Sequence, residues 1–385
     1  MNRSLIAAAS LLALGACADQ SAGPVASMGE APLLSASSPV DGSYIVVLKE
    51  GANPRSVAAV SGVSPRYVYG AALNGFAASL SAGQLRAMQS NPSVAYIEQD
   101  GVVHHTTVTQ TNATWGLDRI DQRNLPLSTT FSYTNTGLGV NAYIVDTGID
   151  IDHVEFAGRA SHGFDAFADG QNGNDCNGHG THVAGTTGGT VYGVAKAVKL
   201  VGVRVLNCDG SGTWSGVVAG IDWVAQNRVL PAVANMSLGG GYSQAVNDAT
   251  TRLIDAGVAT AVAAGNDGRD ACKYSPASTP RAMTIGWTTR IDEKSTFSNL
   301  GDCVDWFAPG SGITAAWIGS GNTETNSISG TSMASPHAAG VAALYLQSNP
   351  GASPDAVRDA LYAATTKGIV TRSRTRNNHL LYTAW

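Results

Sequence analysis

Residues 233–264 read VANMSLGGGYSQAVNDATTRLIDAGVATAVAA and contain two apolar runs on either side of an amphipathic stretch. The runs at 233–236 and 258–264 predict buried strands. Between them, residues 243–256 carry apolar side chains at helical spacing and end at Gly257, which predicts a helix with a glycine stop. This stretch therefore predicts one strand–helix–strand unit.

The same alternation extends over the chain from Trp115 onward. Apolar runs at 140–145 and 200–205 also predict strands, and helical stretches separate them. Alternating strands and helices imply an α/β fold, in which helices cover both faces of a mostly parallel sheet. The ligand crevice of such a sheet lies at the carboxyl ends of its strands, so we expect the functional side chains there.

The composition excludes several classes of protein. Charged residues make up 13% of the 385 residues and the formal net charge is −5, so the chain lacks the basic field that nucleic-acid binding requires. No apolar stretch reaches the roughly 20 residues that span a bilayer, which excludes a channel or transporter. Hydrophobic residues make up 44%, enough for a large core, and this excludes a disordered chain.

The first 17 residues are typical of a secretory signal. Arg3 precedes a short apolar run at 5–16, and the run ends Leu-Gly-Ala-Cys17, which resembles a bacterial lipobox. In a lipobox the cysteine carries lipid and becomes the new N-terminus, so Cys17 is a candidate membrane anchor of the precursor. The alternative is an ordinary cleaved signal with a chance cysteine. Residues 18–41 are rich in Ala, Ser, Gly and Pro and predict a flexible linker.

A small separate unit is predicted over residues 42–105. Its pattern is β-α-β-β-α-β, which is the order of the ferredoxin-like α+β motif. Because about 60 residues form only a small core, we expect this unit to depend on a larger one. The predicted strands are 44–48, 66–69, 75–80 and 94–98, and the predicted helices are 53–60 and 81–90.

Four segments of the larger region place reactive side chains at the ends of predicted elements. Asp146 follows a strand, His179 opens a glycine-rich helix start, Asn266 follows another strand, and Ser332 begins a helix. Acyl transfer needs a hydroxyl nucleophile, an imidazole base, a carboxylate that fixes the imidazole tautomer, and donors for the oxyanion. The sequence contains all four kinds of group.

Each of these groups also has a simpler interpretation. A single serine at a helix start is usually only an N-cap, and the Asp-Thr-Gly at Asp146 lacks the second copy that an aspartic protease needs. His179 and His182 lack the zincin spacing, and we interpret His182 as a structural histidine. An α/β-hydrolase would need Gly-x-Ser-x-Gly, but position 334 is alanine.

The order Asp, His, Ser and the strings at 179–185 and 330–337 resemble the subtilisin-like serine proteases, in particular the proteinase K and aqualysin branch. The resemblance runs from about residue 42 to the end of the chain. It implies a subtilisin-like three-layer α/β/α peptidase domain over residues 106–385. The unit at 42–105 resembles the inhibitory propeptide and folding chaperone of that family.

The resemblance assigns a role to each reactive residue. Asp146 orients the imidazole, His179 is the general base and then the acid, and Ser332 is the nucleophile. Asn266 and the Ser332 backbone N–H form the oxyanion hole. The expected protein is a secreted, monomeric serine endopeptidase that acts on peptides and proteins, with its own propeptide as intramolecular inhibitor. The alternative from another class is a membrane-anchored, inactive subtilase-like binding or inhibitor module.

The groove that would bind substrate is expected to be lined by small residues. Backbone without bulky side chains can pair with an extended peptide, so we expect broad specificity. Trp214 departs from the residues expected at the wall of the S4 subsite and leaves the preference at P4 open. The resemblance places the S1 walls at the segments 237–240 and 263–265. The expected groove residues are Gly210, Ser211, Gly212, Trp214, Ser237, Leu238, Gly239, Ala263, Ala264 and Gly265.

Structural Ca²⁺ is the expected cofactor. Asp118, Asp121 and Gln122 stand at i, i+3 and i+4, so one turn can direct three oxygen ligands at one ion, although a solvated polar turn would have the same spacing. The resemblance also implies calcium at this site and at a second one. The second site consists of the Pro280 and Ala282 carbonyls with Asp305, and Asp165, Asp169 and Asp175 form a weaker third candidate.

Four cysteines remain once Cys17 is set aside, an even number in an exported and therefore oxidising setting. Four thiols allow three connectivities, and the residues alone do not choose among them. The resemblance pairs Cys176 with Cys208 and Cys272 with Cys303. Self-processing of the precursor is also expected, with the mature chain beginning between about residues 103 and 115.

Overall fold

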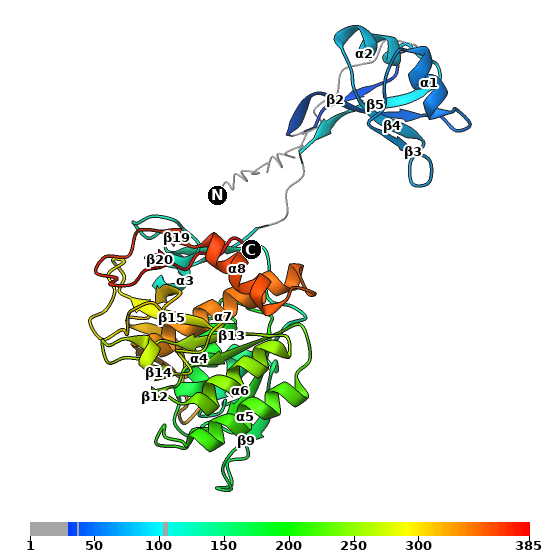
Figure 1. The fold of residues 1–385 in the computed structure, drawn as a ribbon. Coiled ribbons are helices and arrows are strands. Elements are labelled where there is room, and N and C mark those ends of the chain that lie inside the picture. The colour runs from blue at the N-terminus through cyan, green and yellow to red at the C-terminus, as the bar shows by residue number, and fades with distance from the viewer. Residues whose placement is uncertain (1–29, 37, 103–106) are drawn as a thin grey trace, which may run out of the picture. The chain divides into compact units, whose positions relative to one another are not determined.

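The computed structural model describes residues 30–36, 38–102 and 107–385. The signal segment and Cys17 lie outside these ranges. The chain divides after His105 into two compact units, each with its own core (Figure 1). The two units are described separately.

The smaller unit has the ferredoxin-like order that the sequence predicted. Its sheet has the strand order β1-β5-β2-β4-β3, and Ser81 starts the second helix through a capping box with Gln84. The fully buried side chains of Val46, Phe76 and Ile97 lie at the centre of its core. The elements are β2 (Pro39–Leu48), α1 (Pro54–Val60), β3 (Tyr67–Tyr69), β4 (Gly75–Ser79), α2 (Ala82–Gln89) and β5 (Val94–Gly101).

The expectation of a flexible linker over residues 18–41 is wrong for the part that the structure describes. Strand β1 (Leu33–Leu34) pairs in parallel with β5, with Leu33 opposite Ile97, and β2 already begins at Pro39. A two-residue strand has too few residues to show alternation, so its pairing is set by the free edge of β5 and not by its own pattern.

The larger unit is built on a nine-stranded, mostly parallel sheet with the order β19-β20-β16-β15-β13-β11-β8-β10-β9. The α/β class predicted from the sequence is therefore confirmed. Only the β19–β20 pair of this sheet is antiparallel. The strands are β8 (Asn141–Asp146), β9 (Ala160–Asp165), β10 (Lys199–Arg204), β11 (Ala232–Met236), β13 (Val258–Ala263), β15 (Met283–Thr288), β16 (Trp306–Pro309), β19 (Thr366–Lys367) and β20 (His379–Leu380).

Helices cover both faces of this sheet (Figure 1). Side chains of β8 alternate between two cores: Ala142 and Ile144 pack in the core of one face, and Tyr143 and Val145 in the core of the other. The strand therefore has almost no polar face, as expected for a strand buried on both sides. One face carries α4 (His179–Gly188) and α7 (Thr331–Ser348), and the other carries α5 (Trp214–Asn227) and α6 (Gln244–Asp255).

Shorter elements surround the sheet. Strand β6 (Val108–Thr111) pairs antiparallel with β7 (Thr130–Tyr133), and α3 (Trp115–Ile120) is entirely buried. Two further pairs join β12 to β14 and β17 to β18, and α8 (Pro354–Ala364) packs beside α7. Their bounds are β12 (Gly240–Gly241), β14 (Tyr274–Ser275), β17 (Ile313–Ala316) and β18 (Thr325–Ile328).

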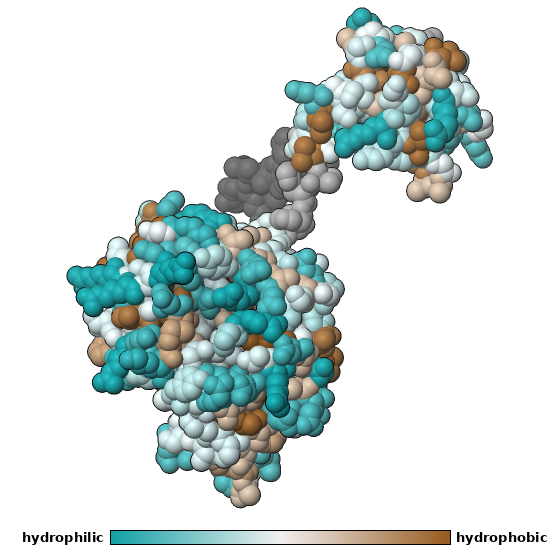
Figure 2. All heavy atoms as spheres, viewed as in Figure 1, coloured by the Kyte–Doolittle hydropathy of each residue, from teal (hydrophilic) through white to brown (hydrophobic). Residues whose placement is uncertain are grey.

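The last residues of the chain complete the core of the larger unit. Leu381 is fully buried, the Thr383 backbone N–H donates to the Ile120 carbonyl over 2.7 Å, and the Trp385 ring contacts Tyr345 edge to face. In the ranges that the structure describes, no helix is long and apolar enough to cross a membrane. Figure 2 shows hydrophilic surface interspersed with small apolar areas on the displayed face.

Candidate active site

The four predicted reactive residues come from four element ends on one edge of the sheet. Asp146 ends β8, His179 begins α4, Asn266 follows β13 and Ser332 lies in the first turn of α7. Glycine is required where α4 meets the turn after β8, because a Cβ on Gly180 would lie 2.2 Å from the Gly148 carbonyl oxygen. The glycines of this motif therefore bring the imidazole close to the carboxylate.

Asp146 and His179 form a direct pair. His179 Nδ1 lies 2.7 Å from Asp146 Oδ1, the carboxylate is fully buried, and the imidazole is 25% exposed. Burial alone lowers the pKa of His179, but the charge and hydrogen bond of Asp146, with the charge of Asp175, raise the pKa above its usual value. A partly exposed imidazole whose other nitrogen is held by a buried carboxylate is suited to act as a base.

Ser332 is held by its backbone at the end of β11. Pro336 has no N–H to donate to the Ser332 carbonyl four residues earlier, and the Ser237 hydroxyl donates to that carbonyl instead, over 2.8 Å. The buried Asn235 side chain donates in turn to Ser237 Oγ and accepts from Ser335 Oγ. The Ser332 hydroxyl itself donates to the Ser237 carbonyl over 3.1 Å.

This support for Ser332 was only partly foreseen from the sequence, which placed Ser237 in the groove for its small size. The available signal was Asn235, a polar residue inside an otherwise apolar strand. A buried amide needs hydrogen-bond partners, so its presence there pointed to a network.

Hydrogen bonds from Thr331 fix the side-chain oxygen of Asn266. Its Oδ1 accepts from both the backbone N–H and the hydroxyl of Thr331, each over 2.9 Å. Its Nδ2 makes no hydrogen bond to the described residues, and Asn266 lines the same pocket as Ser332. The residue is exposed, so this amide is accessible from outside. The arrangement can donate a hydrogen bond to an oxygen that develops negative charge near Ser332.

The predicted groove residues lie in two adjoining clefts of about 770 Å³ and about 260 Å³. His179 lines the larger cleft and Ser332 the smaller, and both clefts share Ser237, Leu238, Gly239 and Gly240. All ten predicted groove residues line at least one of the two clefts. The larger contains Gly210, Ser211, Gly212 and Trp214, and the smaller contains Ala263, Ala264 and Gly265. Lining residues that the sequence did not indicate include Leu206, Val217, Tyr274 and Ala277.

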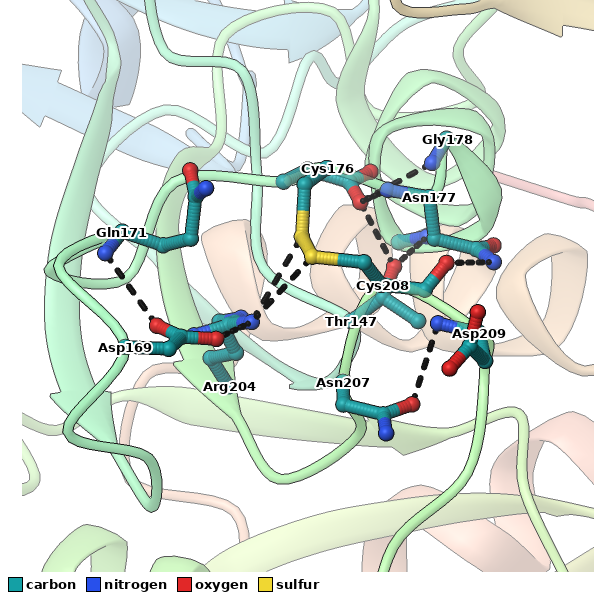
Figure 3. Close-up of a disulfide and its surroundings, with 12 residues drawn as sticks. Thr147, Asp169, Gln171, Cys176, Asn177, Gly178, Arg204, Asn207, Cys208 and Asp209 are labelled. Atoms are coloured by element: carbon teal, nitrogen blue, oxygen red, sulfur yellow. Dashed lines mark hydrogen bonds and ion pairs between the residues drawn. A yellow bond between two sulfur atoms is a disulfide. The ribbon is translucent and has the colours of Figure 1, made fainter.

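A disulfide ties the wall of the larger cleft to the segment that leads into α4 (Figure 3). Cys176 pairs with Cys208, and Asn177 Nδ2 donates to the Cys208 carbonyl over 2.9 Å while its Oδ1 accepts from the His179 N–H. The second disulfide joins Cys272 to Cys303. These are the pairings that the resemblance implied.

The third candidate calcium site is wrong. Asp165 and Asp169 both pair with the fully buried guanidinium of Arg204, at 3.0 and 2.7 Å, and Figure 3 shows the Asp169–Arg204 pair beside the disulfide. The hydrogen bond from Arg204 lowers the pKa of Asp169 to about 2. Asp175 instead accepts hydrogen bonds from the residues around the start of α4, including Thr181 and Thr147. Arg204 therefore neutralises Asp165 and Asp169, and hydrogen bonds within the protein hold Asp175.

The first candidate site has oxygens that fit calcium. Asp118 accepts from the 128–129 backbone, and Asp121 Oδ2 accepts from the Ser132 N–H over 2.7 Å. The other oxygen of Asp121 is buried without a hydrogen-bond partner, and burial, with the charge of Asp118, raises the pKa of Asp121 to about 6. Gln122 uses its Nε2 to bind nearby carbonyls, which leaves its Oε1 as an acceptor. A buried carboxylate oxygen without a partner is the kind of ligand that a hard cation takes.

The second candidate site does not fit calcium, because Asp305 is already paired with Arg358. Across the described part of the chain, no three His, Cys, Asp or Glu side chains gather as a set of metal ligands. His182 is fully buried with Nε2 2.9 Å from the Ile313 carbonyl oxygen, and burial lowers its pKa to about 4. It is a structural histidine, as the sequence indicated.

Comparison with known proteins gives a consistent result. Residues 137–380 match the subtilase family, and residues 43–106 match the peptidase inhibitor I9 family. An extracellular serine proteinase of Thermus sp. (strain Rt41A) is 51% identical over 401 residues, covering 97% of each chain. Alkaline serine exoprotease A of Vibrio alginolyticus is 53% identical over 320 residues, 82% of this chain and 59% of that one. A solved cold-adapted subtilisin-like serine proteinase has a TM-score of 0.70 and 53% identity, covering 71% of this chain and 100% of that one.

Proposed function

The chain belongs to the subtilase family and is a serine endopeptidase, and we propose that it hydrolyses peptide bonds through Ser332, His179 and Asp146. The extracellular relative, which matches over nearly the whole chain, supports a secreted enzyme. The observation that carries the catalytic assignment is the 2.7 Å contact between a buried Asp146 and a partly exposed His179, at the same groove as Ser332. None of the relatives described above is named as an inactive binding or inhibitor module.

In the proposed reaction His179 takes the Ser332 hydroxyl proton as the oxygen bonds to the substrate carbonyl carbon. The Asn266 amide and the Ser332 backbone N–H donate to the resulting oxyanion. His179 then gives the proton to the leaving amine as the carbon–nitrogen bond breaks, which leaves an acyl group on Ser332. Water, activated by the same imidazole, releases the acid and restores the hydroxyl. Asp146 keeps the imidazole in the required tautomer throughout.

This assignment is tested by Ser332→Ala with Ser329→Ala as a matched control. Ser329 is an exposed serine three residues earlier that accepts from the Gly312 N–H. The Ser332 variant should lose nearly all hydrolysis. The expected fall in kcat is ~10⁶-fold, as measured for the nucleophile of a subtilisin. Ser329→Ala should keep its activity and its labelling by a serine-directed inhibitor. Substantial residual hydrolysis by purified Ser332→Ala would contradict the assignment.

Broad specificity follows from how the groove would hold a peptide. The segments 210–212 and 237–239 offer backbone with few bulky side chains, so an extended substrate can pair with them as an added strand. Main-chain hydrogen bonds do not depend on the substrate's side chains, and the small residues 263–265 admit a large apolar or aromatic P1 group. Cleavage sites mapped in a denatured protein should therefore vary widely in sequence.

The smaller unit is proposed to inhibit the peptidase until it is cut off by Ser332 itself. Its match to the peptidase inhibitor I9 family supports inhibition within the same chain. Because β6 pairs with β7, a cut before Val108, within the proposed range of 103–115, would leave that pair intact. Purified Ser332→Ala should then stay full length, and its cleavage without another protease would contradict self-processing.

We also propose that Cys17 carries lipid in the precursor, so that the cut releases a soluble, monomeric enzyme from a membrane-held pro-unit. Ser332→Ala should then sediment with membranes, and Ser332→Ala with Cys17→Ser should not. A lipid-free Ser332→Ala precursor in the soluble fraction would exclude the anchor while leaving the catalytic assignment intact.

One structural calcium ion is proposed at the first candidate site, with Asp118, Asp121 and Gln122 as ligands. These residues lie in and next to α3, and none of them belongs to the proposed catalytic set. The ion would neutralise the two neighbouring carboxylates and so stabilise the buried α3 segment. It would act on stability and not on the chemical step.

A further inference from the structure

At the second calcium site that the resemblance implies, a guanidinium stands where a metal would bind. Arg358 on α8 pairs with one oxygen of the Asp305 carboxylate, and the Thr284 N–H donates to the other over 2.8 Å. Both oxygens therefore have a donor, and one donor carries a full positive charge. We propose that Arg358 takes the place of calcium at Asp305, so that an ion pair stabilises this part of the sheet and no metal binds there.

Asp305 needs a positive partner because of where it lies. It is only 8% exposed, and it precedes β16 beside β15, where its backbone N–H also donates to the Thr284 carbonyl over 2.9 Å. A buried carboxylate is costly unless it is paired. Arg358 reaches it from the second turn of α8 and is itself 32% exposed, so the pair connects this helix to the sheet.

The residues that would supply the other ligands lie beside a second arginine. Arg281 stands between Pro280 and Ala282, whose carbonyls are the remaining expected ligands. It pairs with Asp355 at the start of α8 over 2.8 Å and with Asp255 at the end of α6 over 2.5 Å. Each of the three aspartates of this region is thus already in contact with one of the two arginines. A divalent cation would add positive charge near two guanidinium groups, and these stay protonated and positively charged in proteins.

The donor set is also too small for calcium once Arg358 is in place. Two carbonyls and one carboxylate are well short of the six to eight oxygens that calcium takes, so water would have to supply the rest. Arg358 removes one of the two carboxylate oxygens from that set. The ion pair and the metal are therefore alternatives at Asp305, and removing the arginine should restore the metal site.

The test measures how many calcium ions the full chain binds, by equilibrium dialysis against radioactive calcium. Ser332→Ala is the parent, so that the chain does not digest itself. Adding Asp305→Asn should leave the number of bound ions unchanged, whereas adding Arg358→Ala should raise it by one. Arg372→Ala is the matched control, because it removes an arginine from an exposed pair with Glu293 and should bind as the parent does.

Melting temperatures in calcium and in chelator give a second readout. Adding calcium should raise the melting temperature of the Arg358→Ala chain by more than it raises that of the parent. It should not do so for Arg358→Lys, which keeps the positive charge. A loss of one bound ion in Asp305→Asn would overturn the proposal, and this comparison does not require the Arg358 variants to fold. An Arg358→Ala chain that folds but gains no calcium would overturn it as well.

Discussion

Thr331 fixes the orientation of the Asn266 side chain, because its backbone N–H and its hydroxyl both donate to Asn266 Oδ1 over 2.9 Å. An amide held by its oxygen keeps its two N–H donors for other partners, and Asn266 lines the same pocket as Ser332. The residue next to the proposed nucleophile therefore sets the direction of the proposed oxyanion donor.

Asn266→Ala should lower kcat while leaving KM nearly unchanged, because the lost donor acts on the oxyanion and not on the bound substrate. The expected loss is on the order of 10²–10³, as measured for one oxyanion donor in a subtilisin. Thr331→Ser keeps both donors to Asn266 and should retain most of the activity, so it serves as the control. An Asn266→Ala enzyme with unchanged kcat would contradict the role of this amide.

The rate should depend on the protonation of His179. Because Asp146 and Asp175 raise the pKa of His179, more of the imidazole stays protonated near neutral pH, and only the neutral form acts as a base. The acid limb of kcat/KM should therefore have its midpoint above ~6.5, the usual histidine value. The measurement is a pH profile with a short chromogenic peptide, and a midpoint well below that value would contradict the interpretation.

Removing calcium should lower the melting temperature without changing kcat at a temperature where the enzyme is fully folded. Without the ion, Asp118 and Asp121 repel one another in a partly buried position. Asp121→Asn should abolish the response to chelator, whereas Asp152→Asn, at a carboxylate distant in sequence from α3, should keep it. Equal melting temperatures with and without chelator in the inhibited wild-type enzyme would rule out the ion.

The two disulfides should differ in their effect on catalysis. Each closes a loop of similar size, with separations of 32 and 31 residues, so each should contribute about 3–4 kcal/mol to stability in the chain-entropy model. Cys176 and Cys208 directly precede Asn177 and Asp209, which line the larger cleft, and Cys176 lies three residues before α4. Replacing this pair with serines should raise KM for a tetrapeptide substrate more than the same change at Cys272–Cys303. Equal KM values in the two folded variants would contradict the positional argument.

Trp214 should restrict the far end of the groove. It lines the larger cleft and lies against Gly240, where a Cβ would be 2.8 Å from the indole ring. Trp214→Ala should deepen that end and favour substrates with a large apolar P4 side chain over alanine at P4, by roughly tenfold in kcat/KM, which corresponds to about 1.4 kcal/mol. Trp223→Ala, on a later turn of the same helix, should leave the P4 preference unchanged.

Local patterns in the sequence were enough for the main elements and for the edge of the sheet where the site lies. Apolar runs and helix stops predicted β8, β10, β11, β13 and α6 to within a residue or two, since burial on both faces leaves a clear signal. The positions of the reactive residues at element ends followed from the α/β class. The disulfide pairing, by contrast, came from the resemblance alone.

The features that sequence reasoning missed depend on partners far away in the chain. Arg204 draws Asp165 and Asp169 away from any metal, and Arg358 reaches Asp305 across 53 residues. An aspartate that binds calcium and one that binds arginine have the same local pattern, so spacing alone does not distinguish them. Only the packing of α8 against the sheet decides between the two at Asp305.

The order in which the core of the larger unit is completed also determines whether a truncated chain can be active. Asp146, His179 and Ser332 are all synthesised before Leu381, Thr383 and Trp385, yet Leu381 fills the core of the larger unit and the other two contact Ile120 and Tyr345. A truncated chain that stops after Ser332 therefore carries every reactive group but lacks most of α7, all of α8 and Leu381, so its core stays open. Such a fragment should fail to fold and be degraded. Incomplete synthesis should thus give an unfolded, inactive fragment and not an unregulated hydrolase.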